Sequence, residues 1–241
     1  MKSGSVRAWL ELLRVPNLLT VPGDPLAGWA LASAGIEGGR VPWLVCAASL
    51  CLYAAGLLLN DVADLEEDRV ARPTRPIPSG RISRAAACAV AVLLAAVGLV
   101  LCASVNARAG FLGLALLAVI VLYDLWLKRL PVIGSSAMGA CRGLNVMLGA
   151  AAATGGLLDS TAFIAAGAET LYIAVVTQFA RGETRGATSW TPARIGTLIS
   201  ALLWIQAAFC AVSGGIGIWI AVVLAALWPI LRLLGRRFPM S

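Results

Sequence analysis

The chain has 241 residues, of which 60% are hydrophobic and 13% charged, and its mean hydropathy is +0.88. A soluble domain is roughly 45–50% apolar and about 25% charged, so this composition excludes an ordinary soluble protein and predicts a multi-pass membrane protein. The net charge of +7 is spread over segments that flank apolar runs, as membrane orientation alone predicts, and no nucleic acid partner is expected.

The chain contains no histidine, and its six cysteines all lie inside apolar runs. The missing histidines exclude histidine acid–base chemistry and axial haem ligation by histidine, and together with the absence of paired cysteines they exclude zinc sites. The cysteines are expected to pack as small hydrophobic side chains rather than to form disulfides.

The apolar runs are long and continuous, without the alternation of barrel strands, which favours membrane-spanning helices of about 20 residues. We expect an all-α, polytopic transmembrane bundle that forms one domain over residues 1–241. About eight spans are predicted, near residues 16–34, 42–60, 85–104, 109–127, 132–153, 158–179, 195–213 and 216–234.

The distribution of Lys and Arg predicts how the bundle sits in the cell membrane. If the spans alternate, 16 of the 19 basic residues fall on one side. Cationic residues accumulate on the cytoplasmic side. Both termini and the loops at 61–84, 128–131 and 180–194 are therefore expected in the cytoplasm.

Five carboxylates fall within residues 61–68, where the second predicted span leaves the membrane. On a continued helix, Asp61, Asp64 and Asp68 would share one face, with Asn60 beside them. Such an oxygen-rich face suits Mg²⁺, which is usually held by one or two carboxylates together with phosphate. Calcium is the less favoured alternative, because the glycine-containing 12-residue loop of an EF-hand is missing.

Arginines follow directly in "RVARPTRPIPSGRIS", where three prolines stiffen the segment and oppose helix formation. Guanidinium groups bind phosphate bidentately, so Arg72 and Arg75 beside a metal-binding face suit a diphosphate. With apolar helices beneath, a polyisoprenyl diphosphate is the expected substrate. Alternatively, the charges only anchor the loop to lipid headgroups, which explains the arginines but not the spacing of the acids.

These motifs resemble those of the UbiA superfamily of intramembrane prenyltransferases. "NDVADLEED" matches the NDxxDxxxD motif, "RPTRPIPSGRIS" is similar to the arginine- and proline-rich continuation, and "YDLWLK" to a tyrosine-to-lysine segment; "MGACRGLNVMLGA" resembles a bacterial branch. The resemblance implies a helical bundle with a central cavity open to the cytoplasmic side. It also implies Mg²⁺-dependent ionisation of an isoprenyl diphosphate and prenyl transfer to an acceptor that the sequence does not identify.

Residue roles follow from the same resemblance. The metal would be held by Asn60, Asp61, Asp64 and Asp68, the three aspartates being catalytic. Substrate-binding roles fall on Asn17, Arg72, Arg75, Tyr123 and Lys128.

The family's second acidic motif is reduced here to "VVTQFARGETRG", in which Glu183 is the only carboxylate. Glu183, with Gln178, is expected to take that place in the substrate site. Two alternatives remain open: Asp124 contributes from the fourth span, or one metal binds instead of two. As a purely structural residue, Glu183 would be a solvated acid paired with Arg181 or Arg185.

Polar residues inside predicted spans are costly and usually functional or paired. Arg142 and Asn145, three residues apart, are expected to face the interior together and to contact the diphosphate or the acceptor; capping a neighbouring helix is the alternative. Glu169 is expected to pair with Arg142; a role as a base on the acceptor side is the alternative. Gly139 and Gly143 predict close helix packing.

Two rival functions remain open beside prenyl transfer. One is an intramembrane terpene cyclase that needs no acceptor. The other is a non-enzymatic transporter or a relative that has lost activity. Prenyl chain length and oligomeric state are not predicted.

Overall fold

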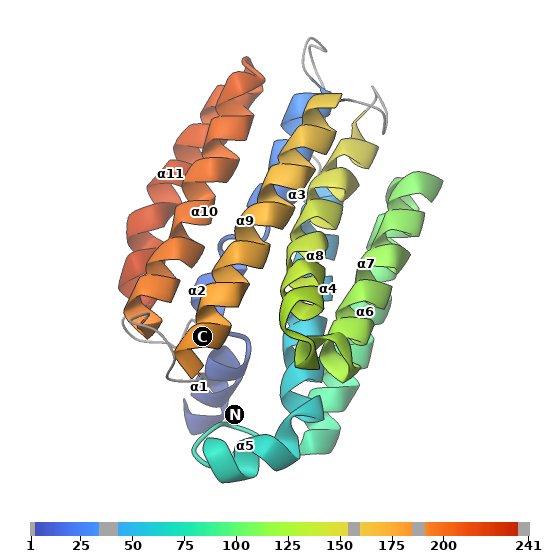
Figure 1. Ribbon diagram of the computed structural model, residues 1–241. Coiled ribbons are helices and arrows are strands. Elements are labelled where there is room, and N and C mark those ends of the chain that lie inside the picture. The colour runs from blue at the N-terminus through green and yellow to red at the C-terminus, as the bar shows by residue number, and fades with distance from the viewer. Residues whose placement is uncertain (1–2, 34–42, 154–159, 185–190, 236–241) are drawn as a thin grey trace.

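In the computed structural model, residues 3–33, 43–153, 160–184 and 191–235 are described, and every regular element within them is a helix (Figure 1). The elements are α1 (Ser3–Leu12), α2 (Val15–Leu18), α3 (Gly23–Ala32), α4 (Trp43–Ala63), α5 (Leu65–Ala71), α6 (Arg84–Val105), α7 (Ala107–Leu125), the 3₁₀ turn η1 (Leu127–Arg129), α8 (Pro131–Ala152), α9 (Ser160–Thr184), α10 (Pro192–Val212) and α11 (Ile216–Gly235).

Six of the described helices, α4, α6, α7, α9, α10 and α11, are long and apolar enough to cross a membrane. Their outer faces carry large apolar side chains such as Val100, Phe111 and Trp219, which are 67–72% exposed and suit contact with lipid. The more polar α8 has 22 residues and packs against α3, α7 and α9 in the centre of the bundle. The predicted all-α, multi-pass membrane fold is confirmed.

The first predicted span, 16–34, differs from a single helix. It consists of α2 and α3, separated by a turn that ends at Pro22, whose missing N–H prevents a continuous helical ladder. Side chains of neighbouring helices bind the backbone that the break leaves without helical partners: the Thr20 carbonyl accepts hydrogen bonds from Arg142 Nη1 (3.3 Å) and Gln206 Nε2 (2.9 Å). Irregular backbone is tolerated at membrane depth only where the protein supplies such partners.

Glycines allow α8 to approach two neighbouring helices closely. A Cβ atom on Gly139 would overlap the carbonyl oxygen of Thr170 in α9, and one on Gly143 would overlap the hydroxyl of the same residue. On the α3 side, a Cβ on Gly149 would overlap the carbonyl oxygen of Pro25. The close packing predicted from the first two glycines is confirmed.

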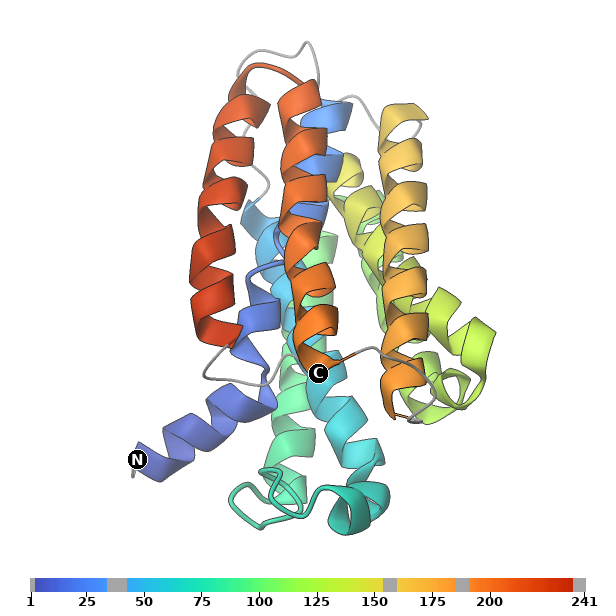
Figure 2. The ribbon, with the colours of Figure 1, turned by 60° about the vertical axis from the view of Figure 1, so that its left-hand side comes forward.

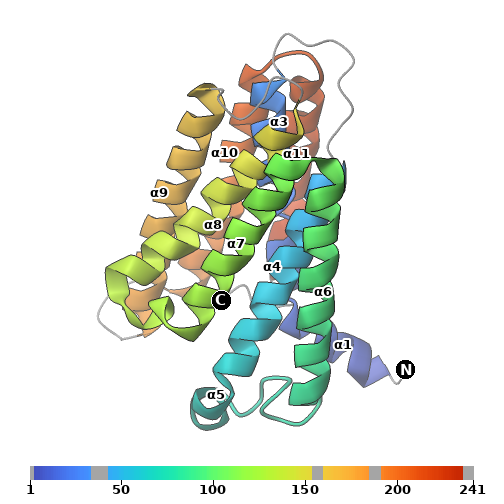
Figure 3. The same cartoon turned by 90° about the vertical axis from the view of Figure 1, so that its right-hand side faces the viewer.

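The segments that carry the sequence motifs gather at one end of the bundle. The short helix α5, the irregular segment 72–83, the turn η1 and the last turns of α9 and α11 all lie there (Figures 1 and 3). Helix α1 projects sideways from the same end (Figure 2), and Glu11 in it accepts a 2.7 Å hydrogen bond from Arg81 in the irregular segment. Residues 72–83, which contain the three prolines, are non-helical, as predicted.

Candidate active site

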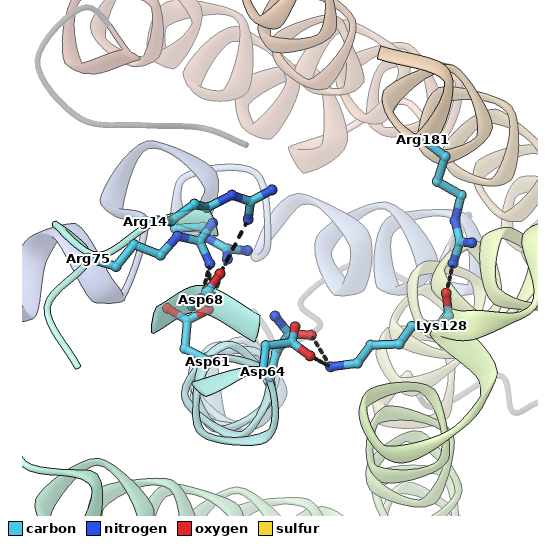
Figure 4. Close-up of polar contacts among 9 residues, drawn as sticks. Arg14, Asp61, Asp64, Asp68, Arg75, Lys128 and Arg181 are labelled. Atoms are coloured by element: carbon cyan, nitrogen blue, oxygen red, sulfur yellow. Dashed lines mark hydrogen bonds and ion pairs between the residues drawn. The ribbon is translucent and has the colours of Figure 1, made fainter. Parts of the chain in front are cut away.

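The acidic motif lies where α4 gives way to α5. The chain turns at Asp64, whose backbone angles are φ −88° and ψ 5°, so the two helices do not continue as one. The expectation of a single carboxylate face was therefore wrong. Asp61 and Asp68 point to one side and Asp64 to the other (Figure 4).

On the first side, buried Asp61 and Asp68 share one guanidinium group. Arg75 Nη1 lies 2.8 Å from Asp68 Oδ2 and 3.6 Å from Asp61 Oδ1. Arg14 Nη2, from the α1–α2 linker, contacts Asp61 Oδ1 at 3.1 Å. Arg72 Nη1 lies 3.8 Å from Asp68 Oδ1, and its half-exposed side chain forms the outer edge of the cluster.

On the second side, a lysine bridges the remaining two oxygen donors. Lys128 Nζ, from η1, lies 2.5 Å from Asp64 Oδ1 and 3.2 Å from Asn60 Oδ1. The Lys128 carbonyl accepts a 2.6 Å hydrogen bond from Arg181 Nη2 in α9 (Figure 4). This bond fixes η1 between α4 and α9, and thus positions the lysine.

The donor set suits Mg²⁺ as two oxygen pairs. Within the described ranges, no three acidic or cysteine side chains converge on one point. Instead, the oxygens form two pairs, each around one cationic nitrogen. Arg75 Nη1 lies between Asp61 and Asp68, and Lys128 Nζ lies between Asp64 and Asn60. Because Mg²⁺ is usually held by one or two carboxylates plus phosphate and water, either pair fits it chemically. The metal role of these four residues stays a prediction.

A cavity of about 260 Å³ lies next to these pairs. Leu116, Ile120, Ile173 and Val176 give it apolar walls. The predicted site residues Asn17, Asn60, Tyr123, Arg142 and Asn145 all line it, together with Arg14 and Asp124. The remaining predicted cations, Arg72, Arg75 and Lys128, lie outside its lining, in the charge cluster described above.

Arg142 in α8 belongs to a buried polar cluster with Asp24 in α3 and Gln206 in α10. Its Nη1 is 3.0 Å from Asp24 Oδ2, its Nη2 donates to Thr20 Oγ1 at 3.0 Å, and its guanidinium lies 5.5 Å from the Tyr53 ring centroid. The partner expected from the sequence was Glu169, and this pairing was wrong: Glu169 is fully buried, and neither of its oxygens accepts a hydrogen bond among the described residues.

Three further predicted residues lie on α8 and α9. Asn145 Oδ1 accepts a 2.8 Å hydrogen bond from Ser49 Oγ, which ties α8 to α4 beside the cavity. Gln178 Oε1 accepts one from Ser135 Oγ at 2.8 Å, so it binds α8. Glu183 lies in the last turn of α9, and its side chain falls outside the described part.

Three further polar residues were not predicted as part of the site. Arg14 is the only described non-glycine residue with a positive φ, 45°, and it reaches both the cavity and Asp61. Asp24 and Gln206 join the Arg142 cluster through a 2.5 Å bond from Gln206 Nε2 to Asp24 Oδ1. The signal available for Asp24 was a lone carboxylate in an apolar run, a position that is expensive in a membrane.

Comparisons with known proteins agree with this arrangement. Residues 25–238 match the UbiA prenyltransferase family. The digeranylgeranylglyceryl phosphate synthase of Methanothrix thermoacetophila is 35% identical over 145 residues, which cover 60% of this chain and 54% of that protein. The synthase of Sulfurisphaera tokodaii is 30% identical over 148 residues, 60% and 52% of the two chains. The chain spans about half the length of the curated relatives it matches.

Solved structures share the fold. A structure of digeranylgeranylglyceryl phosphate synthase superposes with a TM-score of 0.64 at 23% identity, covering 94% of this chain and 85% of that one. A UbiA homologue from Archaeoglobus fulgidus bound to GPP and Mg²⁺ superposes with a TM-score of 0.58 at 16% identity, covering 95% and 87%. With its motifs assembled on this bundle and residues 25–238 matched, the chain belongs to the UbiA prenyltransferase family.

Proposed function

We propose that this protein transfers a prenyl group from an allylic diphosphate to an acceptor within the membrane, and that it requires Mg²⁺. One observation carries the proposal: two oxygen pairs, each bridged by a cation, lie beside an apolar cavity. The acidic groups suit a metal, the cations suit a diphosphate, and the cavity suits a hydrocarbon chain.

The basic residues would hold and stabilise the diphosphate. Arg14, Arg75 and Lys128 come from three separate segments and end within one charge cluster. As the allylic carbon–oxygen bond breaks, negative charge grows on the leaving diphosphate, and positioned guanidinium and ammonium groups stabilise that charge. Mg²⁺ bound by these oxygen pairs would supply further positive charge to the same leaving group.

The apolar walls would protect the allylic cation. Leu116, Ile120 and Val176 present no nucleophile, and a cavity that excludes water prevents hydrolysis of a reactive intermediate. For the acceptor, the names of the relatives point to glyceryl phosphates, so we propose a prenylated glyceryl phosphate as the first acceptor to test.

We also propose that the α5 end of the bundle faces the cytoplasm. The excess of Lys and Arg on the segments at that end supports this orientation under the positive-inside rule. A cysteine-reactive, membrane-impermeant label applied to intact cells would test it with a Glu66→Cys variant. Labelling only after lysis is expected, and labelling of intact cells would contradict the orientation.

The activity is tested with purified protein and geranyl, farnesyl and geranylgeranyl diphosphates. Pyrophosphate release is expected only with Mg²⁺. Asp64→Asn should lower it by about 100-fold or more, since Asp64 would help to hold the Mg²⁺ that stabilises the developing charge, and one such stabilising group is worth that much. Glu66→Gln is the matched control, because this exposed acid contacts only Arg69 in the described structure. Metal-independent release, or full activity of Asp64→Asn, contradicts the proposal. A cyclic product formed without acceptor would point to a cyclase.

A further inference from the structure

Asp124 is a buried carboxylate that forms none of the ion pairs found among the described residues of the charge cluster. It is the second-last residue of α7, only 3% of its surface is exposed, and it lines the cavity. Its Oδ2 atom is buried and has no hydrogen-bond partner among the described residues. The carboxyl group therefore keeps unused capacity to accept a proton or a hydrogen bond, and the residue borders the cavity.

Stability does not explain a carboxylate at this position. The C-terminal end of a helix carries partial negative charge, which repels a carboxylate in the last turn. Burial in a membrane protein adds a desolvation cost that pairing normally offsets. The nearest basic side chain along the chain, Lys128, places its Nζ on Asp64 and Asn60 instead. Positions that break local rules without a stabilising gain are expected at functional sites.

The location of Asp124 separates its role from that of the acidic motif. Asp61, Asp64 and Asp68 lie outside the cavity lining, in contact with the cations that would bind diphosphate, whereas Asp124 lines the cavity. The acceptor must reach the cavity, because its nucleophilic atom attacks the carbon that the diphosphate leaves. Of the acidic side chains in the described residues, Asp124 alone lines that space.

We propose that Asp124 is the catalytic base that deprotonates the acceptor. This inference rests on the proposed prenyl transfer. The allylic carbon–oxygen bond breaks and its electron pair leaves with the diphosphate. An acceptor hydroxyl oxygen forms the new bond to carbon, and its proton passes to the Asp124 carboxylate. The proton returns to water when the products leave.

The test compares wild type with Asp124→Asn in liposomes made from total lipid extract of the host, with labelled geranylgeranyl diphosphate and Mg²⁺. Pyrophosphate release and labelled lipid adduct are measured separately. A general base typically accelerates the reaction step that it assists by about 10²–10⁴-fold. We therefore expect adduct formation to fall by about 100-fold or more, and a larger fraction of the substrate to end as prenyl alcohol. Asp124→Glu should recover part of the adduct rate.

Two further readouts exclude a structural role. Because Asp124→Asn removes a buried carboxylate whose Oδ2 has no hydrogen-bond partner among the described residues, its thermal midpoint should equal or exceed that of wild type. Glu169→Gln is the matched control: it also neutralises a fully buried acid, but one that does not line the cavity, so adduct formation should stay at the wild-type rate.

The remaining outcomes separate the two proposals. Wild-type protein that releases no pyrophosphate refutes the proposed function itself. Wild-type protein that releases pyrophosphate without forming any lipid adduct refutes prenyl transfer, and with it the role of Asp124 as a base. An equal loss of release and adduct in Asp124→Asn, with a raised Mg²⁺ requirement, would assign the residue to metal binding instead. A lowered thermal midpoint of Asp124→Asn, or an unchanged rate of adduct formation, would also refute the proposed role of Asp124 as the catalytic base.

Discussion

Removing one partner of the ion pair between Arg142 and Asp24 is predicted to destabilise the bundle strongly, because it leaves the other charge buried without compensation. Asp24 is fully buried at the start of α3, and Arg142 reaches it from α8 at 3.0 Å while also donating to Thr20 Oγ1. Arg142→Gln removes the cation and leaves the buried carboxylate with only neutral donors such as the amide of Gln206 among the described residues. The perturbation thus creates an uncompensated charge at the break in the first membrane segment.

The magnitude follows from the burial of the pair. Removing one partner of a buried ion pair costs about 3–5 kcal/mol. In a chain of this size each kcal/mol shifts the thermal midpoint by about 2–4 °C, so Arg142→Gln should lower it by roughly 6–20 °C. Asp24→Asn should cost a similar amount. The double variant should cost less than the sum of the two, with a coupling energy of about 1–3 kcal/mol, because no charge is left unpaired.

The assay is thermal unfolding in detergent, followed by the fluorescence of the eight tryptophans. Arg69→Gln is the control, since Arg69 and its partner Glu66 are 56% and 77% exposed and such a pair contributes less than about 1 kcal/mol. Strictly additive losses in the double variant, or an equal loss in the exposed control, would refute the assignment of this stability to the buried pair.

Two other predictions concern packing and binding. Gly149→Val should destabilise by about 1–3 kcal/mol or more, because its side chain meets the Pro25 carbonyl, whereas Gly167→Val meets open space and should change the thermal midpoint little. Arg75→Ala should raise the KM for the allylic diphosphate by about tenfold or more, because a charge-assisted phosphate contact is lost. Arg69→Ala should leave the KM near wild type, because Arg69 pairs only with Glu66 in the described part of the chain. Thermal unfolding measures the effect of the glycine variants, and steady-state kinetics of pyrophosphate release measure the two KM values.

The long helices could be predicted from the sequence because each is a continuous apolar run of about 20 residues. The bounds of α4, α6, α7 and α8 lie within a few residues of the predicted spans. The break in 16–34 was missed, because averaging over a whole span hides a proline-containing turn when its neighbours are apolar. The backbone at Thr20 is satisfied by residues more than 100 positions away, which no local pattern reveals.

The candidate site was predicted in composition but not in pairing. The acidic and basic residues of the motif do lie together, since they are close in sequence. Their partners differ, because the helix changes direction at Asp64 and brings it to Lys128 instead of its neighbouring aspartates. The Arg142 pairing failed for a related reason: Glu169 was the acid within a long helix, whereas Asp24 lies at an interruption that sequence periodicity does not show.

Interruptions of helices are what bring the site together. Asp64 lies between α4 and α5, Lys128 in the short turn after α7, Arg14 at a left-handed residue before α2, and Asp24 just after the break before α3. A continuous membrane helix satisfies its own backbone and sends side chains out in a fixed sequence of directions, so it cannot aim several charges at one point. Each interruption frees a direction but exposes polar groups that neighbouring side chains must satisfy. The residues expected to bind and transform substrate are therefore concentrated where helical periodicity fails, and there a reading based on periodicity was least accurate.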